Sequence, residues 1–366
     1  MKVLFLTQFG EKGGSSRIQV IQFLSRLRAG GFTCIHNAIY HDLFYDVHMG
    51  LRILPVLRKK LNLIYHLLWA LIRRCYFTLT AWRYDVIIIQ KDTFPLLLYT
   101  LLTTINRRVI YEIDDTIFEI NPFHNDSKLN LLLLKYQAYL CKKMMQGAVL
   151  VVAENEYLAN EARRHNKHVM VLSAPIDVKA MYPRTGERTG SGPVTIGWIG
   201  SPSTTYMLEE ILSVFQELAK RVGGWRLKTV GARGDFKADG VPLITKPWRL
   251  EEQLADLQSF DIGIMPLDDS PFNRGRLGYK MIQYMAVGIP TVAENRGLNK
   301  TVIVNGENGF LVSGVSEWVS RLKELIEDAS LRARLGKGGR RMAENRFSLE
   351  RLTEVWREAI SRAARL

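Results

Sequence analysis

Short apolar runs alternate with stretches of helical periodicity along the first part of the chain. The runs predict strands at residues 3–7, 32–38, 85–90, 108–113, 148–153 and 168–173. Between these runs apolar side chains recur at helical spacing, which indicates helices that each bury one face. Strands that alternate with helices are typical of an α/β domain with a parallel, doubly wound sheet, whose binding sites lie at the carboxyl ends of the strands.

The pattern changes near residue 173, where prolines and glycines replace the apolar runs, and a second α/β pattern begins at residue 194. A chain of 366 residues is long enough to build two separate cores. We therefore expect four parts: a first domain at 1–180, a linker at 181–193, a second domain at 194–348, and a final helix at 349–366 that crosses back to the first domain.

The loop after the first predicted strand is rich in glycine and leads into a helix. It holds Gly13 and Gly14, and Arg17 lies one helical turn beyond them. A glycine-rich loop at the carboxyl end of a first strand suits a bound phosphate group. Its spacing is not GxGxxG, so the loop alone is weak evidence for a nucleotide.

A second loop of this kind lies within residues 260–312. An apolar strand ends at Pro266, a polar loop follows, and a helix is predicted at 277–287 with Arg276 and Lys280 in its first turns. Free backbone N–H groups and the positive end of the helix point toward such a loop, so this arrangement favours an anion site. The alternative is that the two cations lie on a solvated helix face.

Two adjacent acids, Asp114 and Asp115, follow the strand predicted at 108–113. An acid at a strand end is placed to orient or deprotonate an acceptor hydroxyl. The segment 112–115 is also similar to an acidic motif that binds Mg²⁺ or Mn²⁺ through oxygen ligands in a different fold, but the two-domain pattern speaks against that fold. The third possibility is that Asp115 caps a helix. The histidines show no HxH or HExxH spacing, so we expect no metal site.

The formal charge of +14 requires an anionic partner, and phosphate is common to the candidates: nucleic acid, a nucleotide substrate, or an anionic membrane surface. No helix-turn-helix or RNA-binding signature is present, so we expect no nucleic acid partner. The three cysteines are few and far apart, which favours a reducing compartment. The apolar run at the N-terminus is too short for a signal sequence, so a cytoplasmic location is expected.

The segment 51–83 is basic and apolar and contains no acidic residue. Its longest run without charge, 61–72, is well short of the roughly 18 apolar residues that span a bilayer. The segment therefore predicts an amphipathic helix that lies on an anionic membrane surface, at the inner face of the cell membrane. The alternative is a core helix with a solvated basic edge.

The most specific pattern is the run KMIQYMAVGIPTVA at 280–293, followed by NGENGFLV at 305–312. Together they resemble the donor-binding motif of the group 1 (GT4-type) retaining glycosyltransferases. Shorter stretches of the chain resemble other segments of that family, at 153–158, 175–177 and 196–203. The resemblance implies an α/β fold of GT-B architecture, with two doubly wound Rossmann-like domains facing across a cleft.

This resemblance also implies a hexosyltransferase that moves a sugar from a nucleotide-diphosphate sugar to a glycan or lipid-linked acceptor, with retention of configuration. The implied setting is envelope polysaccharide biosynthesis. The nucleotide sugar is a substrate, and neither a cofactor nor a metal is expected. Asp114 and Asp115 are the predicted catalytic residues. The predicted donor-binding residues are Gly13, Gly14, Arg17, Ser201, Ser203, Arg276, Lys280 and Gln283.

Two positions depart from the pattern of this family, which commonly has two glutamates eight positions apart. The first falls on Gly275 and the second on Gln283, whose amide still offers hydrogen bonds to a ribose hydroxyl. We expect Arg276 and Lys280 to replace the basic residues that many relatives place near Ser201. Two alternatives remain, a catalytically silent GT-B subunit that scaffolds a glycan assembly complex, and a sugar-nucleotide epimerase or hydrolase of the same fold.

Overall fold

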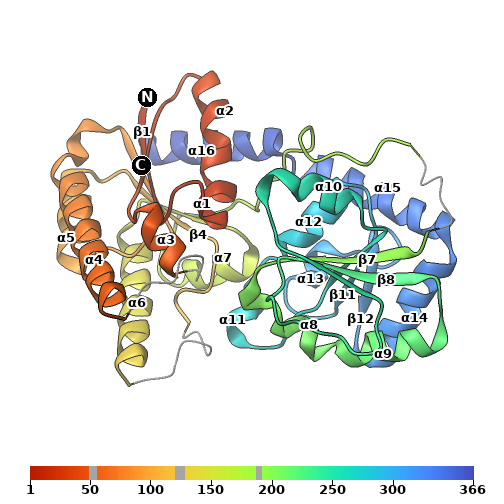
Figure 1. Ribbon diagram of the computed structural model, residues 1–366. Helices are drawn as coiled ribbons and strands as arrows, with labels where there is room; N and C mark the ends of the chain where they lie inside the picture. The colour runs from red at the N-terminus through yellow and green to blue at the C-terminus, as the bar shows by residue number, and fades with distance from the viewer. Residues whose placement is uncertain (49–55, 120–127, 187–191) are drawn as a thin grey trace. The chain divides into compact units, whose positions relative to one another are not determined.

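The computed structural model describes residues 1–48, 56–119, 128–186 and 192–366 (Figure 1). The chain forms two compact units: unit 1 comprises residues 1–175 and 350–366, and unit 2 comprises residues 176–349. Each unit is built on one six-stranded sheet whose paired strands are parallel. The predicted α/β class is therefore confirmed in both units.

The sheet of unit 1 has the order β2-β1-β3-β4-β5-β6. Its strands are β1 (Lys2–Thr7), β2 (Thr33–Ala38), β3 (Val86–Gln90), β4 (Val109–Ile113), β5 (Leu150–Ala153) and β6 (Val169–Val171). Its helices are α1 (Gly14–Gln19), α2 (Leu24–Ala29), α3 (Asp42–His48), α4 (Val56–Leu79), α5 (Leu96–Ile105), α6 (Lys128–Gly147), α7 (Glu156–Arg163) and α16 (Leu349–Arg365). The single helix expected after β1 is interrupted at Val20, whose φ of −131° and ψ of −60° are not helical.

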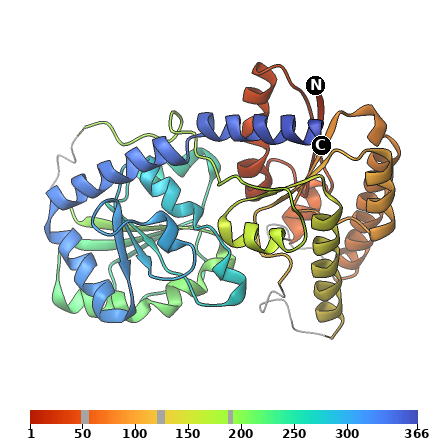
Figure 2. The same ribbon diagram turned by 180° about the vertical axis from the view of Figure 1, so that it is seen from behind.

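Helices cover both faces of this sheet, which is why its central strands β3 and β4 are buried along their whole length (Figures 1 and 2). On one face, Leu4 and Tyr111 share a core with α4, α5 and α6. On the other face, the fully buried ring of Trp356 on α16 meets the rings of Phe5 and Phe23 edge to face, with centroids 6.3 Å apart in each pair. The last helix of the chain thus packs on its first strand.

The sheet of unit 2 has the order β12-β11-β10-β7-β8-β9. Its strands are β7 (Val194–Ile199), β8 (Trp225–Val230), β9 (Leu243–Lys246), β10 (Ile262–Met265), β11 (Thr291–Glu294) and β12 (Gly309–Val312). Its helices are α8 (Tyr206–Glu210), α9 (Leu212–Arg221), α10 (Gln253–Gln258), α11 (Pro271–Arg274), α12 (Tyr279–Ala286), α13 (Asn299–Val302), α14 (Gly314–Glu327) and α15 (Ala329–Arg346). The helix α12 begins two residues later than predicted from the sequence.

Two glycines at the centre of this sheet allow helix α12 to approach it closely. Gly197 of β7 and Gly263 of β10 are paired across the sheet. A Cβ atom on Gly197 would overlap the ring of Phe260, and a Cβ atom on Gly263 would overlap the ring of Tyr284. Only glycine leaves room for these two rings, so the small residues fix the distance between α12 and the sheet.

The ring of Tyr284 also ties α12 to both strands by hydrogen bonds. Its hydroxyl accepts from the N–H of Ile199 at 3.2 Å and donates to the carbonyl of Ile264 at 3.3 Å. Tyr284 lies one helical turn after Lys280, so the same anchoring places Lys280 at the carboxyl end of the sheet.

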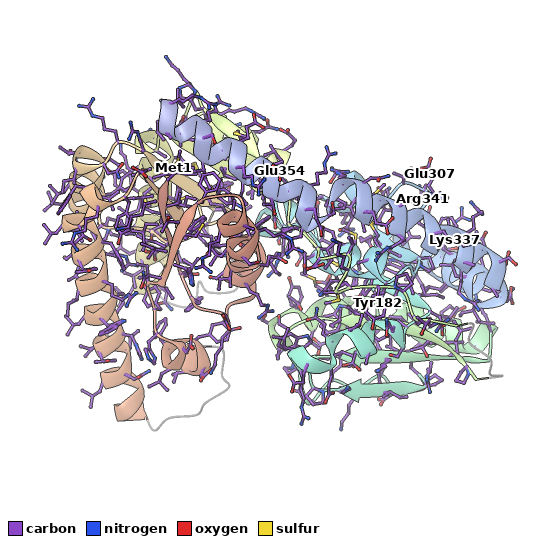
Figure 3. The ribbon with its side chains drawn as sticks, turned by 90° about the horizontal axis from the view of Figure 1, so that it is seen from above. Met1, Tyr182, Glu307, Lys337, Arg341 and Glu354 are labelled. Carbon is purple, nitrogen blue, oxygen red and sulfur yellow. The ribbon has the colours of Figure 1, made fainter. Side chains whose placement is uncertain are left out.

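The packing of α16 gives a prediction for stability. Replacing Trp356 with Ala removes the largest side chain between α16 and β1, and we expect the free energy of unfolding of unit 1 to fall by about 3–5 kcal/mol. Urea unfolding measures this change. The control is Glu354→Ala on the same helix (Figure 3), whose exposed side chain forms an ion pair with Arg357. Its expected effect is within about 0.5 kcal/mol, and equal effects of the two variants would contradict the packing argument.

Candidate functional site

The strand order of unit 2 reverses between β7 and β10, because the chain first builds outward through β8 and β9 and then returns to the other side of β7. Ligands of doubly wound sheets bind at this point, beyond the carboxyl ends of the strands. The loop after β7 begins at Gly200, and the loop after β10 begins at Pro266. The predicted residues of unit 2 all lie in or directly after these two loops.

A hydrogen-bonded triad joins the two loops. The hydroxyl of Tyr206, at the start of α8, donates to Asp268 Oδ2 at 2.7 Å. The amide of Asn273 donates to both Asp268 oxygens and to Tyr206 Oη, each at 2.9 Å. Burial alone would raise the pKa of Asp268, but the hydrogen bonds from Ser270, Asn273 and Tyr206 outweigh it and hold the pKa below its usual range. Asp268 therefore remains charged.

Two cations lie together beside this triad. The ammonium of Lys280 lies 4.9 Å from the centroid of the Trp198 ring, and Arg276 is close enough to affect its charge. Burial, together with the nearby Arg276 charge, lowers the pKa of Lys280 to about 7. Within the described ranges, neither cation has a side-chain hydrogen bond or an ion pair. Two neighbouring cations that form no ion pair within the described ranges suit the binding of an anion.

The other predicted residues of unit 2 lie on α12 and in the loop after β7. Gln283 is buried on α12. Among the described residues, none forms a hydrogen bond with its side-chain amide. Ser201 and Ser203 follow β7, and their hydroxyl oxygens lie 2.9 Å apart. Thr204 closes this turn by accepting from the N–H of Ser201 at 3.3 Å. Ser201 and Ser203 are thus accessible hydroxyls at the end of β7.

The structure also shows what stands near Gly275, where the family commonly has an acid. Asn273, two residues earlier, is fully buried, and its Oδ1 atom has no hydrogen-bond partner in the part of the chain that is described. Asp268 and Asn273 belong to the polar loop that the sequence singled out. Nothing in the sequence indicated that Tyr206 would hydrogen-bond to them. Its hydroxyl could be found only once α8 and the loop after β10 were brought together.

In unit 1, Asp114 and Asp115 lie at the carboxyl end of β4 beside a lysine that the sequence did not single out. Lys91 Nζ lies 3.1 Å from Asp115 Oδ2 and 3.5 Å from Asp114 Oδ1. Among the described residues, Lys91 is the only one other than glycine with a positive φ, of 57°. Such a conformation costs about 1 kcal/mol or more for a residue with a Cβ, and it turns this ammonium toward the two acids.

Two further carboxyl groups lie buried in this region, Glu112 on β4 and Glu154 directly after β5. Glu154 Oε1 accepts from the amide of Gln19 at 2.6 Å, and Glu112 Oε2 has no hydrogen-bond partner among the described residues. Burial raises the pKa of Glu112 and of Glu154 well above the usual range, and the charge of Asp114 adds to both shifts. Burial also raises the pKa of Asp114, against the lowering effect of Lys91.

The glycine loop of unit 1 is connected to these acids through one glutamine. Gly13 and Gly14 begin α1, and the Arg17 guanidinium donates to the carbonyl of Glu11 at 2.9 Å. Ser16, on the same helix, donates to the side chain of Gln90 at 3.2 Å. Gln90 in turn donates to Asp114 Oδ2 at 3.5 Å. The structure thus brings the glycine loop and the two acids together within unit 1, while the cations belong to unit 2.

The alternative roles of the two acids can be compared with this geometry. Asp115 Oδ1 accepts from the N–H of Thr116 at 2.9 Å, but residues 115–119 form a turn and not a helix, so Asp115 is not a helix cap there. No group of three or more potential metal ligands with suitable geometry occurs within residues 1–48, 56–119, 128–186 and 192–366. Whether the reaction needs a metal stays a prediction.

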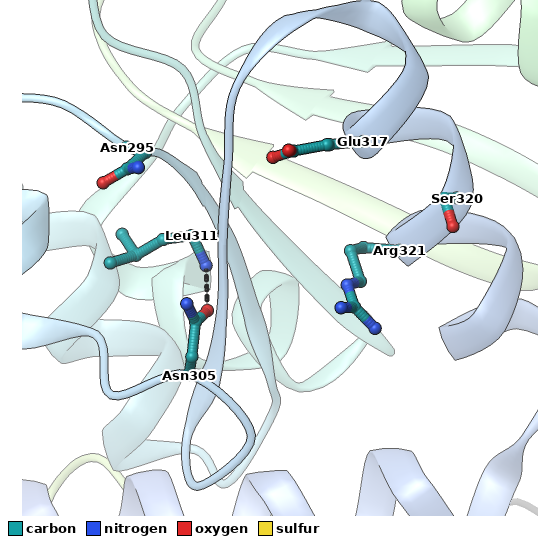
Figure 4. Close-up of a pocket in the computed structure, with 6 residues that line it drawn as sticks. All are labelled: Asn295, Asn305, Leu311, Glu317, Ser320 and Arg321. Atoms are coloured by element: carbon teal, nitrogen blue, oxygen red, sulfur yellow. Dashed lines mark hydrogen bonds between the residues drawn. The ribbon is translucent and has the colours of Figure 1, made fainter.

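A hollow of unit 2, of about 450 Å³, is lined by none of the predicted site residues (Figure 4). Its lining residues are Asn295, Asn305, Leu311, Glu317, Ser320 and Arg321. Asn305 Oδ1 accepts from the N–H of Leu311 at 2.7 Å, and Arg321 pairs with Glu324 at 2.7 Å. Because these polar groups are already used within the protein, we do not assign the anion site to this hollow.

Comparison with known proteins places unit 2 in a family. Residues 193–328 match the family model described as Glycosyl transferases group 1. This segment belongs to the group 1 glycosyltransferases. The resemblance stated from the 280–312 pattern is confirmed for this part of the chain. The match includes both loops of the anion site, from Ser201 to Lys280.

Three similar proteins extend this result. A stretch of 73 residues is 37% identical to spore coat protein SA of Bacillus subtilis (strain 168) and covers 19% of each chain. A stretch of 90 residues is 33% identical to the capsular polysaccharide biosynthesis glycosyltransferase CapM of Staphylococcus aureus and covers 24% of this chain and 23% of that protein. Anabaena HepE, solved in complex with UDP-glucose, is 18% identical with a TM-score of 0.67 over 99% of both chains.

The structural likeness shows the fold, which is the GT-B architecture of two Rossmann-like units. The sequence matches to the two relatives span less than a quarter of the length of each, so the activity of those whole proteins does not carry over to this chain.

The buried acids of unit 1 give a prediction with a defined sign. The folded-state pKa of Glu154 lies above its ordinary value of 4.5. Its contribution to the free energy of unfolding is therefore fully present below pH 4.5 and is lost as the pH rises through the folded-state pKa. Replacing Glu154 with Gln removes this titration and keeps an oxygen that accepts the hydrogen bond from Gln19. We expect the fall in unfolding free energy between roughly pH 5 and 8 to become shallower, by up to about 1.4 kcal/mol per pH unit.

Urea unfolding at several pH values measures this slope. The matched control is Glu156→Gln, two residues further on α7, where the acid is exposed and pairs with Arg163 at 2.8 Å. Its slope should equal that of the unaltered protein. A Glu154→Gln slope that also equals that of the unaltered protein would show that the acid is not held neutral by its surroundings.

Proposed function

We propose that this protein transfers a sugar from a nucleoside-diphosphate sugar, with UDP as the nucleotide, to a glycan or lipid-linked acceptor with retention of configuration. The observation that supports it is the pair of cations Arg276 and Lys280. They lie at the carboxyl end of the unit 2 sheet and form no ion pair in the described ranges, next to loops that match group 1 glycosyltransferases. A diphosphate supplies the charge that these side chains lack.

In this proposal each predicted donor residue of unit 2 has a separate task. Lys280 and Arg276 stabilise the negative charge that develops on the departing diphosphate, without a metal or cofactor. The amide of Gln283 forms a hydrogen bond with a ribose hydroxyl, in place of the charged carboxylate that the family commonly has at this position. The hydroxyls of Ser201 and Ser203 donate to phosphate oxygens.

UDP is the proposed nucleotide because the structural neighbour HepE was solved in complex with UDP-glucose. The support from HepE is a likeness of fold, at 18% identity. The names of the two sequence relatives point to a spore coat and to capsular polysaccharide, and they support a setting in envelope polysaccharide biosynthesis.

Unit 1 is the proposed acceptor side. Asp114 has a raised pKa and lies beside Lys91, so its carboxylate can take the proton of an acceptor hydroxyl as the oxygen of that hydroxyl bonds to the sugar and the nucleoside diphosphate leaves. Asp115 holds Lys91 from the other side. Gly13, Gly14 and Arg17 form the glycine loop at β1 and remain proposed contacts to the donor phosphates. Peripheral attachment to the inner face of the membrane through 51–83 belongs to the same proposal, and a nucleic acid partner does not.

The donor assignment predicts a pH-dependent affinity for UDP. Lys280→Ala should weaken UDP binding about tenfold or more, because a charge-assisted contact is lost. In the unaltered protein UDP binding must keep Lys280 protonated, so affinity should fall as the pH rises above the free-protein pKa of about 7. In Lys280→Ala this dependence should be absent. Calorimetry at roughly pH 6 to 9 measures both effects.

Lys237→Ala, at an exposed lysine of the same unit, is the control and should bind UDP normally. Unchanged UDP affinity in Lys280→Ala would refute the site. If UDP-sugars bind and release free sugar equally fast with and without a glycan, the chain is a hydrolase or epimerase of this fold. If UDP binds and no turnover occurs with any UDP-sugar, the silent scaffold is the better description.

The acceptor assignment predicts a separate effect. Asp114→Asn should lower the release of UDP from UDP-glucose in the presence of a membrane glycolipid fraction by about a hundredfold, with unchanged affinity for UDP. The conservative change keeps the size of the side chain and removes its basicity. Glu156→Gln serves again as the control. Equal turnover in Asp114→Asn would exclude Asp114 as the base and leave the donor site standing.

A further inference from the structure

Helix α4 is turned with its polar residues inward. His66, Arg74 and Thr78 are buried, and they lie on one face of the helix at spacings of four and eight residues. The guanidinium of Arg74 forms a two-point pair with Asp92, at 2.6 Å and 2.9 Å. Arg73 donates to Asn37 Oδ1 at 3.0 Å. Two of the basic residues that predicted contact with lipid phosphates are therefore bound to the protein itself.

The outer face of α4 is apolar instead. Ile72 is 63% exposed, and it is one of a set of large apolar side chains on this helix that are each more than two-fifths exposed. The set comprises Leu61, Leu63, Ile64, Tyr65, Leu67, Leu68, Leu71, Ile72, Tyr76 and Leu79. A surface helix of a globular protein normally shows the opposite arrangement. Such a large apolar surface marks a contact with another apolar phase.

Two more helices continue this surface. The helix α5 packs between α4 and α6, so the three lie side by side along one face of the unit 1 sheet, in orange and yellow in Figures 1 and 2. Leu97 on α5 is 80% exposed and Leu132 on α6 is 63% exposed. The further exposed apolar residues of these two helices are Leu96, Leu101, Leu129, Leu133, Tyr136 and Tyr139. We call the exposed apolar residues of α4, α5 and α6 the apolar face.

The charges around the apolar face indicate what covers it. None of the three helices contains an acidic residue, while α6 carries four lysines, among them Lys128 and Lys135. A second copy of the chain would bring two faces of the same sign together, whereas an anionic lipid surface has the complementary sign. Trp82 is exposed just beyond α4 with the Arg83 guanidinium over its ring, and such aromatic residues are typical of membrane interfaces.

We propose that the apolar face is a membrane-docking surface, on which side chains of α4, α5 and α6 insert together into one leaflet of an anionic bilayer. This extends the attachment proposed above for 51–83 to two further helices. It also changes the main attraction from basic charge to apolar insertion, because the outer face of α4 is apolar. Within the described residues no helix is both long and apolar enough to span a bilayer.

Vesicle flotation of the full chain tests this surface. The vesicles are phosphatidylcholine with about 30% phosphatidylglycerol, and the variants are Ile72→Gln, Leu132→Gln and the two combined. We expect the partition coefficient to fall about threefold for each single variant and about tenfold for the pair, because each change removes an inserting side chain. Leu250→Gln replaces an exposed leucine of unit 2 and should change nothing.

The salt dependence of vesicle binding distinguishes electrostatic attachment from apolar insertion. Raising the ionic strength from roughly 0.1 to 1 M shortens the screening length about threefold, and we expect only a small loss of binding. Complete release by salt, or normal binding of the paired variant, would overturn apolar insertion by these helices. A stable dimer that dissociates in the paired variant would show that a second copy covers the face. UDP affinity should be unchanged in every variant, so this test and the donor test fail independently.

Discussion

The close approach of helix α12 to its sheet is the constraint on which the proposed donor site depends. Gly197 and Gly263 are paired in adjacent strands, and their missing side chains leave room for the rings of Phe260 and Tyr284. Tyr284 then hydrogen-bonds to both strands, which fixes the helix at its closest point. One turn earlier, Lys280 is held over the ring of Trp198. A larger residue at either glycine would displace the helix and the cation with it.

The two units contain buried ionisable side chains of opposite type, acids in unit 1 and a lysine in unit 2. Unit 2 holds Lys280 with its pKa lowered, because burial and Arg276 both disfavour its charge. Unit 1 holds Glu112, Asp114 and Glu154 with raised pKa values, because burial and mutual repulsion disfavour theirs. Neither arrangement stabilises a fold by itself, since burial of an ionisable group that is not fully paired costs free energy. Such costs are usual where a ligand or a proton transfer completes the site.

The sheet of unit 1 is covered differently on its two faces. On one face, α16 closes the core around Trp356, so the chain's last residues stabilise its first strand. On the other face, α4, α5 and α6 cover the sheet with one side and present apolar residues on the other. The same helices thus complete a core and offer a second apolar surface. In the proposed membrane docking, this apolar surface is separate from the sheet edge that carries the acids.

The sequence by itself determined the α/β class, most strands and the family of residues 193–328, because strand periodicity and the 280–312 motif are local patterns. It also placed Lys280, Gln283 and Asp114 at strand ends and helix starts. It could not place Lys91, Glu154 or Tyr206, whose roles depend on neighbours far away in the chain. For α4, composition indicated a basic membrane helix, but only tertiary packing decided which face turns outward. Arg74 turns inward because it pairs with Asp92, which lies in the loop after β3.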